Sequence, residues 1–349
     1  MLSTDDLDWD TLRLSFDTHR APVRWTGETF TDPAKLPYPN GVSIADIENN
    51  DNWVAFLGDT HGNADALRIA VEACRVAGIT HCFHVGDFGY LFSAGEDRDN
   101  PQRTLGDDRV DAILAEARES FGFRLHAIDG NHDNHGLWHR GVKHNHQPYR
   151  VVDDAQWLYH PRGSRIDLAL GGGFDSQGIE HNAHTVSIGF LGGARSINVL
   201  TREEAAAEGV FFWYDEQPTD DDVDHLIAGG ELDILVTHEA PSDYYLSKQL
   251  RISDQMEALS AHTRDRVLRA VWGTEPKLNV HGHWHQSRTG IMGDTKVLCL
   301  DKEYEPGGLA FVDTASNAVV LPEGNAQVRG DADVDWDLLD PTTSVKVLR

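Results

Sequence analysis

Five short polar clusters in this sequence carry side chains that bind divalent metal ions, and each cluster follows a run of apolar residues. The potential ligands are aspartate, asparagine and histidine, whose oxygen and nitrogen atoms suit divalent transition metals. None of the clusters contains a cysteine, so we expect a metal site built from oxygen and nitrogen ligands. The clusters are Gly58-Asp59-Thr60-His61-Gly62, Gly86-Asp87-Phe88-Gly89-Tyr90, Gly130-Asn131-His132-Asp133, Thr237-His238-Glu239-Ala240-Pro241 and His281-Gly282-His283-Trp284-His285.

Seven potential ligands are too many for a single ion. Two octahedral-like ions about 3.5–4 Å apart, sharing one carboxylate and a water, would use them and leave positions for substrate oxygens. Such a pair lowers the pKa of the shared water, and the resulting hydroxide can attack a substrate that is bound beside the ions. A neighbouring imidazole then serves as general acid. The seven residues are Asp59, His61, Asp87, Asn131, His238, His283 and His285.

Short apolar runs that alternate with helical patterns predict an α/β architecture from residue 53 onward. In such folds functional groups gather at the carboxyl ends of strands, where the clusters fall. If the backbone is extended there, side chains two residues apart point to the same side of the chain. Asp59 and His61 can then share one side, and so can His283 and His285. The patterns predict strands at 53–57, 81–85, 124–128, 165–170, 185–191, 233–237, 277–280, 287–292, 295–300 and 309–312, and helices at 64–77, 107–120, 201–208, 219–228 and 254–272.

The ends of the chain differ in pattern from its centre. Residues 1–50 are rich in turn formers, and we interpret them as an irregular extension that packs on the domain. Residues 323–349 are polar and acidic with little core-forming content, which indicates a tail. The predicted domain therefore covers residues 51–322.

Composition restricts the partners and the compartment. The 57 acidic and 30 basic residues give a formal net charge of −27 at pH 7, which disfavours nucleic acid as a partner without excluding it. The three scattered cysteines fit neither a disulfide framework nor a thiolate zinc site. No segment has the pattern of a signal peptide or a membrane span, so we expect a cytoplasmic protein that does not bind membranes. The sequence does not predict an oligomeric state.

The five clusters, in this order, resemble the signature of the calcineurin-like metallophosphoesterase superfamily. That signature is Asp-x-His, then Gly-Asp, then Gly-Asn-His-Asp/Glu, a lone His, and Gly-His-x-His, and it spans Asp59 to His285 here. The segment at 192–197, with 213–216 after it, is similar to one in bacterial and phage members. The resemblance implies a four-layer α/β/β/α sandwich with two mixed β-sheets and metals at the strand ends.

The resemblance also implies a ligand set for each ion. His132 has the position of the family's non-ligand histidine, which contacts the phosphate and protonates the leaving oxygen, and we place Asn131 beside it against the substrate. Asp87 would bridge the two ions. The first ion would bind to Asp59, His61, Asp87 and His285, and the second to Asp87, Asn131, His238 and His283.

One departure from the family concerns the second cluster. Protein Ser/Thr phosphatases continue this block as Gly-Asp-x-Val-Asp-Arg-Gly, whereas here Phe88-Gly89-Tyr90-Leu91 follows. The acidic partner of the catalytic histidine and the phosphate-binding arginine are both missing at those places. Asp133 is a candidate catalytic residue that orients His132, or it forms a turn. Arg195 is a candidate for substrate binding, or it is a surface or capping residue.

These observations favour a dinuclear metal-dependent phosphoesterase that acts on a phosphodiester or nucleotide. Manganese is the first choice for the two divalent ions, with Fe, Zn, Co or Ni as the others, and the expected partner is a small phosphoester. The first alternative is a phosphomonoesterase or protein Ser/Thr phosphatase, and the second is a non-catalytic metal-binding scaffold. Retention of His132 speaks against the scaffold, which needs the ligands but not a general acid.

Overall fold

The computed structural model describes most of the chain between Asn52 and Leu321. The predicted extension (1–50), the predicted helix at 201–208 and the predicted tail (323–349) lie outside the described residues. The described residues are 52–90, 106–139, 146–151, 155–171, 173–174, 180–181, 183–197, 215–242, 244, 254–303, 305, 307–315 and 317–321.

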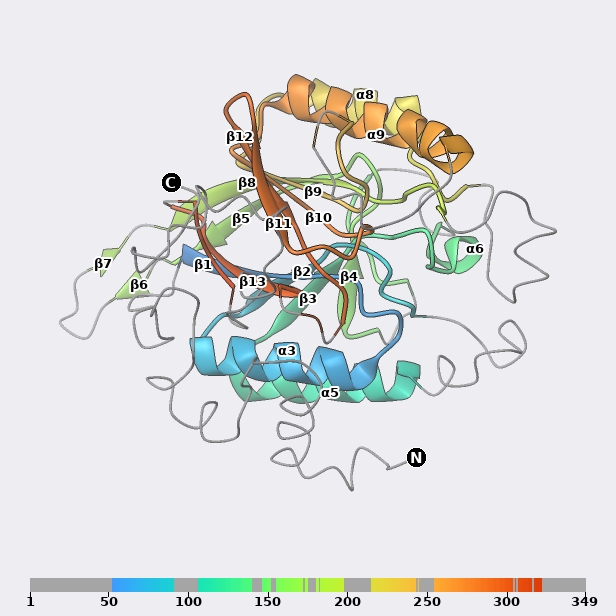
Figure 1. The fold of residues 1–349 in the computed structure, drawn as a ribbon. Helices are drawn as coiled ribbons and strands as arrows, with labels where there is room; N and C mark the ends of the chain where they lie inside the picture. Colours follow the sequence, from blue (N-terminus) through green and yellow to red (C-terminus); the bar gives the residue numbers. More distant parts are fainter. Residues whose placement is uncertain are drawn as a thin grey trace, which may run out of the picture.

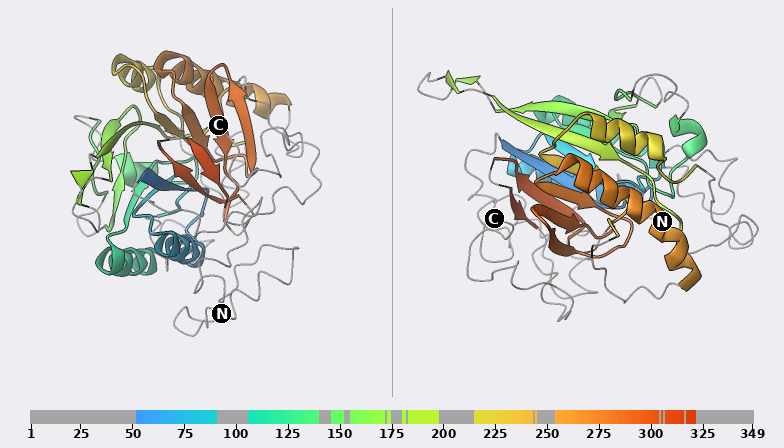
Figure 2. Two further views of the ribbon diagram at one scale, coloured as in Figure 1. Left: turned by 90° about the vertical axis from the view of Figure 1, so that its left-hand side faces the viewer. Right: turned by 90° about the horizontal axis from the view of Figure 1, so that it is seen from above.

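Two β-sheets stack face to face, and a pair of helices covers the outer face of each sheet (Figure 1). The left view of Figure 2 shows these layers after a quarter turn, and the right view, from above, shows α8 and α9 lying over the second sheet. This arrangement confirms the predicted α/β/β/α sandwich. None of the described helices is long and apolar enough to cross a membrane. The four covering helices are α3 (Ala64–Ala77) and α5 (Gly106–Phe121) on the first sheet, and α8 (Asp220–Ala228) and α9 (Asp254–Thr274) on the second.

The first sheet has parallel strands in its centre and antiparallel strands at one edge. The three parallel strands that begin the fold are neighbours, so their carboxyl ends meet at one edge. In spatial order the sheet contains β14 (Ala318–Val320), β13 (Leu309–Asp313), β1 (Trp53–Leu57), β2 (His81–His84), β3 (Arg124–Ala127) and β4 (Trp157–Tyr159).

The second sheet repeats this plan, with a parallel centre and an antiparallel strand at each edge. Its central strands are fully buried, because the other sheet covers one face and helices cover the other. In spatial order the sheet contains β11 (Arg288–Met292), β12 (Thr295–Cys299), β10 (Leu278–His281), β9 (Ile234–Thr237), β8 (His184–Leu191) and β5 (Arg165–Leu170).

Alternation along β1 divides its side chains between two cores. Val54 and Phe56 point between the sheets, whereas Ala55 and Leu57 pack against the helices. Successive strand residues face opposite sides of a sheet, and both sides of this one are covered. The prediction of a buried strand at 53–57 is therefore confirmed.

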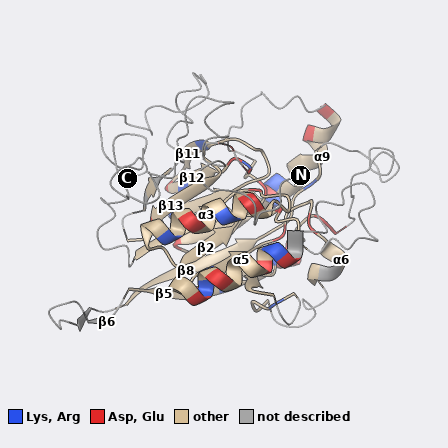
Figure 3. Cartoon of the chain, turned by 90° about the horizontal axis from the view of Figure 1, so that it is seen from below, with Lys and Arg blue, Asp and Glu red and all other residues tan. Residues whose placement is uncertain are grey.

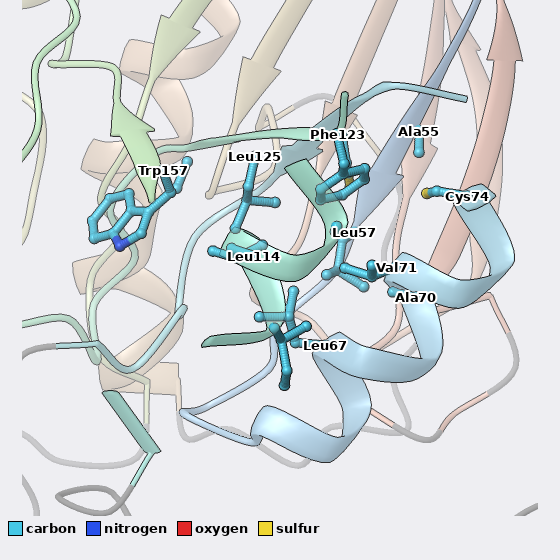
Figure 4. Packing of buried hydrophobic residues seen from close by; sticks show 14 of the residues in the cluster. Ala55, Leu57, Leu67, Ala70, Val71, Cys74, Leu114, Phe123, Leu125 and Trp157 are labelled. Carbon is cyan, nitrogen blue, oxygen red and sulfur yellow. The ribbon is translucent and has the colours of Figure 1, made fainter. Parts of the chain in front are cut away.

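Small and branched side chains of α3 fill the layer beneath the first sheet. Leu67, Ala70, Val71 and Cys74 pack toward the sheet with residues of α5, as Figure 4 shows. The outer faces of α3 and α5 carry interspersed acidic and basic side chains (Figure 3). The helices are thus amphipathic, and their apolar faces hold the sheet from below.

Two helices begin at caps that the sequence provides. Asn63 caps α3 by accepting hydrogen bonds from the N–H groups of Asp65 and Ala66. Thr219 and Asp222 form a reciprocal capping box at the start of α8.

Several short elements were not predicted. They are β4, β14, a four-residue helix α6 (His135–Trp138) and a small two-stranded sheet, β6 (Gly173–Phe174) with β7 (Glu180–His181). Each has four residues or fewer, which is too short for a period to be recognised.

Three histidines form a hydrogen-bonded chain across the first sheet. His81 Nδ1 lies 3.0 Å from His126 Nε2, and His126 Nδ1 lies 2.9 Å from His160 Nε2. The ring of His126 stacks on those of His81 and Phe83, and the ring of His160 stacks on that of Phe190. Burial lowers the pKa of His160 to about 3, so its ring is neutral at pH 7.

This neutral chain predicts a stability that depends on pH. An unfolded histidine binds a proton below about pH 6.5, whereas folded His160 does so only near pH 3. The free energy of unfolding should therefore fall with pH below 6.5, with His160 contributing up to about 1.4 kcal/mol per pH unit. Urea denaturation of the metal-free protein and of His160→Phe between pH 6.5 and 5 measures this contribution. Parallel pH profiles for the two proteins would contradict it.

Candidate active site

The carboxyl ends of the two sheets bring the polar clusters together. Asp59, Asp87 and Asn131 follow the neighbouring strands β1, β2 and β3, while His238 and His283 follow β9 and β10. Contacts join the sheets at this edge. The N–H of His283 lies 3.1 Å from Asp59 Oδ2 and His238 Nδ1 lies 2.8 Å from the carbonyl oxygen of Val85.

The first group of potential ligands consists of Asp59, His61 and His285, whose ligand atoms all lie within 4.8 Å of one another. His285 Nε2 is 3.0 Å from Asp59 Oδ2. His61 Nε2 is 3.6 Å from Oδ2 of Asp87, the fourth residue expected at the first ion.

The second group consists of Asp87, His238 and His283, again within 4.8 Å. Asn131 joins them, because its Oδ1 lies 3.2 Å from His238 Nε2. Asp87 Oδ1 lies 3.4 Å from the same nitrogen. The Asp87 carboxylate therefore has one oxygen toward each group, which is the position of a bridge.

Hydrogen bonds fix which nitrogen of two histidines faces the groups. His238 Nδ1 donates to the carbonyl oxygen of Val85, and His61 Nδ1 donates to Glu303 Oε2 at 2.9 Å. In a neutral imidazole, a protonated Nδ1 leaves the lone pair on Nε2. Both Nε2 atoms thus face the Asp87 carboxylate as potential ligands.

The local backbone differs from the extended alternation that we expected. His61, Asp87, His283 and His285 all have positive φ, between 48° and 67°. Residues other than glycine rarely adopt this conformation, and it clusters at functional sites. Because the backbone is not extended at His283 and His285, the condition for a shared side is not met, and the two residues lie in different groups.

Two glycines are required by the close approach of the clusters. A Cβ on Gly86 would lie 2.4 Å from His238 Nδ1, and one on Gly130 would lie 2.1 Å from Asp87 Oδ1. Side chains at either position would displace a potential ligand. The glycines of these clusters therefore permit the convergence of the strand ends.

Asp59 and Asp87 are fully buried, and both are held ionised. Burial opposes ionisation, but neighbouring histidines lower the pKa of Asp59 and hold that of Asp87 well below its usual range. Burial alone would also lower the pKa of His61 and His238, yet the carboxylates raise it to about 10 in each case. Without metal, imidazolium groups thus balance the carboxylates.

His132 and Asp133 have different surroundings. The His132 N–H donates to Asp87 Oδ1 at 2.7 Å, and its ring centroid lies 5.8 Å from that of His61, beside the first group. Asp133 is buried and accepts N–H bonds from Gly89 and Gly130, each at 2.7 Å. Burial, with the charge of Asp87, raises the pKa of Asp133 to about 7. Asp133 thus joins the second and third clusters through the backbone.

Arg195 is paired with another side chain, and a chain of hydrogen bonds connects it to Asn131. Its Nη1 donates to Glu216 at 2.7 Å, and both residues are buried. Glu216 also accepts from Ser196, which in turn accepts from Asn131. A contact between Arg195 and the substrate stays a prediction.

A third set of potential ligands, Asp129, His135 and His139, is an ion-pair network. Arg162 donates to Asp129 Oδ2 through two nitrogens, at 2.6 and 2.9 Å, and Tyr159 donates to Oδ1. A metal ion here would lie against the Arg162 guanidinium, whose Nη2 is 3.4 Å from His135 Nδ1. We therefore place no metal at this network.

Sequence reasoning missed the acidic residues that support the ligands. Glu303 follows the second-sheet strand β12, and its N–H donates to the carbonyl oxygen of Asp59 at 2.7 Å. Glu239 Oε2 lies 3.7 Å from His283 Nε2, and Glu239 Oε1 accepts from the indole of Trp284 and from the Ala240 N–H. Position after a strand is the one signal that could have pointed to them.

Comparison with known proteins assigns the chain to a family, in agreement with the arrangement of potential metal ligands. The profile of the calcineurin-like phosphoesterase family matches residues 53–287, more than half of the chain. The chain belongs to this family. As a calcineurin-like phosphoesterase, it is a metal-dependent hydrolase of phosphoesters. A comparison with curated proteins gave no match.

Solved structures similar to this calcineurin-like phosphoesterase include those of three other proteins. A putative 5'-nucleotidase from Staphylococcus aureus is 12% identical over 78% of this chain and 55% of that chain, with a TM-score of 0.43. An archaeal phosphodiesterase is 13% identical over 77% and 99%, with a TM-score of 0.32. The phosphopantetheinyl hydrolase from Mycobacterium tuberculosis is 15% identical over 74% and 95%, with a TM-score of 0.36.

The donor set fits the divalent metals that this family uses. Imidazole nitrogens, carboxylates and one amide oxygen suit Mn, Fe, Zn, Co and Ni, and no cysteine lies among the two groups. The buried carboxylates need cations, and divalent metal ions can replace the imidazolium charges.

The contact between Glu303 and His61 predicts that Glu303 contributes to the metal affinity of the first group. Replacing Glu303 with Gln removes the carboxylate that fixes the His61 ring, so the affinity for one metal ion should fall about 10- to 100-fold. Competitive titration with a chromophoric chelator measures both affinities. Glu305→Gln is the control, and equal affinities in the parent and Glu303→Gln proteins would contradict the prediction.

The raised pKa values predict that metal uptake releases protons. At pH 7 His61 and His238, with pKa values of about 10, bind protons that a metal ion must displace. The apparent affinity should therefore rise from pH 6 to pH 8, by up to about tenfold per pH unit for each proton released. Calorimetry in buffers of different ionisation enthalpy counts these protons. Metal binding without proton release would refute this account.

Proposed function

We propose that this calcineurin-like phosphoesterase is a dinuclear enzyme that hydrolyses phosphodiesters or nucleotides. The observation that carries the proposal is the Asp87 carboxylate, which has Oδ2 toward His61 and Oδ1 toward His238. One carboxylate between two groups of ligands suits two ions rather than one. Two divalent ions bound there would lower the pKa of a water and neutralise the charge of the phosphoryl group.

His132 is the candidate general acid. It is partly exposed and lies beside the first group, with its backbone held by the Asp87 carboxylate. A proton on its ring can pass to the leaving oxygen of a substrate bound at the two groups. Asn131, the preceding residue, would contact the same substrate through its position at the second group.

The residues that follow Asp87 in the second cluster argue against the alternative function, that of a protein Ser/Thr phosphatase. Phe88, Gly89 and Tyr90 are buried, and the N–H groups of Phe88 and Gly89 donate to Asp133. This described stretch offers no arginine to bind a phosphate. A phosphomonoesterase of another kind stays the second candidate, and the scaffold the third.

The remaining proposals concern the metals, the compartment and the substrate class. We place manganese first among the possible ions, since its hard character suits the two carboxylates and the amide. The three cysteines are free and buried, which fits the cytoplasm. The net charge of −27 favours a small phosphoester over a long nucleic acid.

Hydrolysis of bis-p-nitrophenyl phosphate by the Mn-loaded protein tests this function. We expect turnover that a chelator abolishes, and a rate for the diester above that for p-nitrophenyl phosphate. His132→Ala should lower kcat about 10²- to 10⁴-fold, because the general acid is lost while the ligands remain.

His262→Ala, which changes an exposed histidine on α9, is the control and should keep the parent rate. A faster monoester reaction would favour the phosphomonoesterase. No turnover from a parent protein that holds two ions would favour the scaffold.

A further inference from the structure

A buried chain of hydrogen bonds leads from Asn131 away from the second group. Asn131 Nδ2 donates to Ser196 Oγ at 3.2 Å, and Ser196 Oγ donates to Glu216 Oε2 at 2.7 Å. All three residues are buried. The chain therefore links a potential metal ligand to a carboxylate that belongs to neither group.

The chemistry of the three groups sets the direction of this chain. An ionised carboxylate only accepts hydrogen bonds, so the Ser196 hydroxyl must donate to Glu216. The hydroxyl oxygen then accepts from the amide nitrogen of Asn131. This turns the amide oxygen toward the second group, where it lies 3.2 Å from His238 Nε2.

Several donors hold Glu216 in place. Its Oε1 accepts from Arg195 Nη1 at 2.7 Å and from the Ser196 N–H at 3.0 Å. Arg162 Nη1 also donates to the backbone carbonyls of both neighbours of Glu216, at 2.8 and 2.6 Å. Burial raises the pKa of Glu216, while the donors from Ser196 and Arg195 lower it. The guanidinium on Oε1 favours the carboxylate at pH 8.

We propose that Glu216 is a positioning residue that fixes the amide of Asn131 through Ser196, and so sets the affinity for the second metal ion. This inference rests on the proposed ligand set. An amide oxygen binds a cation, whereas an NH₂ group has no lone pair to offer. If Glu216 becomes Gln, its NH₂ can donate to Ser196, whose hydroxyl can then donate to Asn131. The amide of Asn131 would turn its nitrogen toward the ion.

Metal titration of Glu216→Gln at pH 8 tests the inference. We expect the affinity for one of two Co²⁺ ions to fall about 10- to 100-fold, with the other affinity unchanged. The Co²⁺ absorption spectrum should change only for the weakened ion. In kinetics with Mn²⁺ below saturation, kcat should fall more than KM rises.

Ser196→Ala separates this effect from damage to the fold. It removes the hydroxyl but leaves the Arg195–Glu216 pair and the Ser196 N–H bond, so its effect should be smaller than that of Glu216→Gln. The double variant should behave as Ser196→Ala alone, because Glu216 acts through the hydroxyl. Additive losses in the double variant would overturn the inference.

Asp233→Asn is a matched control. Asp233 Oδ2 accepts from the N–H and the hydroxyl of Ser187, both at 2.9 Å, just before the amino end of β9 and remote from the ligands. It should leave both metal affinities unchanged. If Glu216→Gln binds both ions with the same affinities as the parent protein, the inference is overturned. It is also overturned if the affinities for both ions fall equally and the variant, measured in chelator, unfolds at a lower temperature than the parent.

Failure of the proposed function gives a different result. In that case the parent protein binds two ions but does not hydrolyse the diester, and the titration still decides the part that Glu216 plays. A parent protein that binds only one ion overturns both proposals.

Discussion

The burial of two carboxylates at the meeting edge of two sheets is the constraint on which this structure depends. Asp59 and Asp87 have almost no contact with solvent, and an isolated buried carboxylate is costly. Cations must therefore be supplied nearby. Histidines from both sheets surround the pair, so the same charges that demand metal ions also join the two halves of the sandwich. If metal ions bind at this pair, as we propose, their binding is coupled to folding through these residues.

The sequence predicted the framework well because the framework obeys local rules. The strand at 53–57 and the helix at 64–77 have the observed bounds, since a buried apolar run and a capped amphipathic segment are both local patterns. The four-layer arrangement with two mixed sheets came only from the family resemblance, and the order of strands within each sheet was not predicted. Short β4 was missed because three residues give no period.

The sequence indicated the seven candidate ligands, whose role stays a prediction, and it did not indicate the residues that hold them in place. Asp59 through His285 were recognisable because each follows a strand, and the structure brings all seven together. Glu303 lies 242 positions from His61, and no local pattern pairs them. Glu216 was noticed only as part of a segment similar to other members. Supporting contacts depend on tertiary packing, which periodicity and spacing do not encode.

The direction of the hydrogen bonds in the histidine chain of the first sheet follows from the surroundings of His160, at the buried end of the chain. His160 Nδ1 has no hydrogen-bond partner among the described residues, and a buried lone pair costs less there than a buried N–H. His160 therefore donates from Nε2 to His126, which donates from Nε2 to His81. All three rings share one tautomer, so the chain is polar, with its hydrogens directed toward the partly exposed ring of His81.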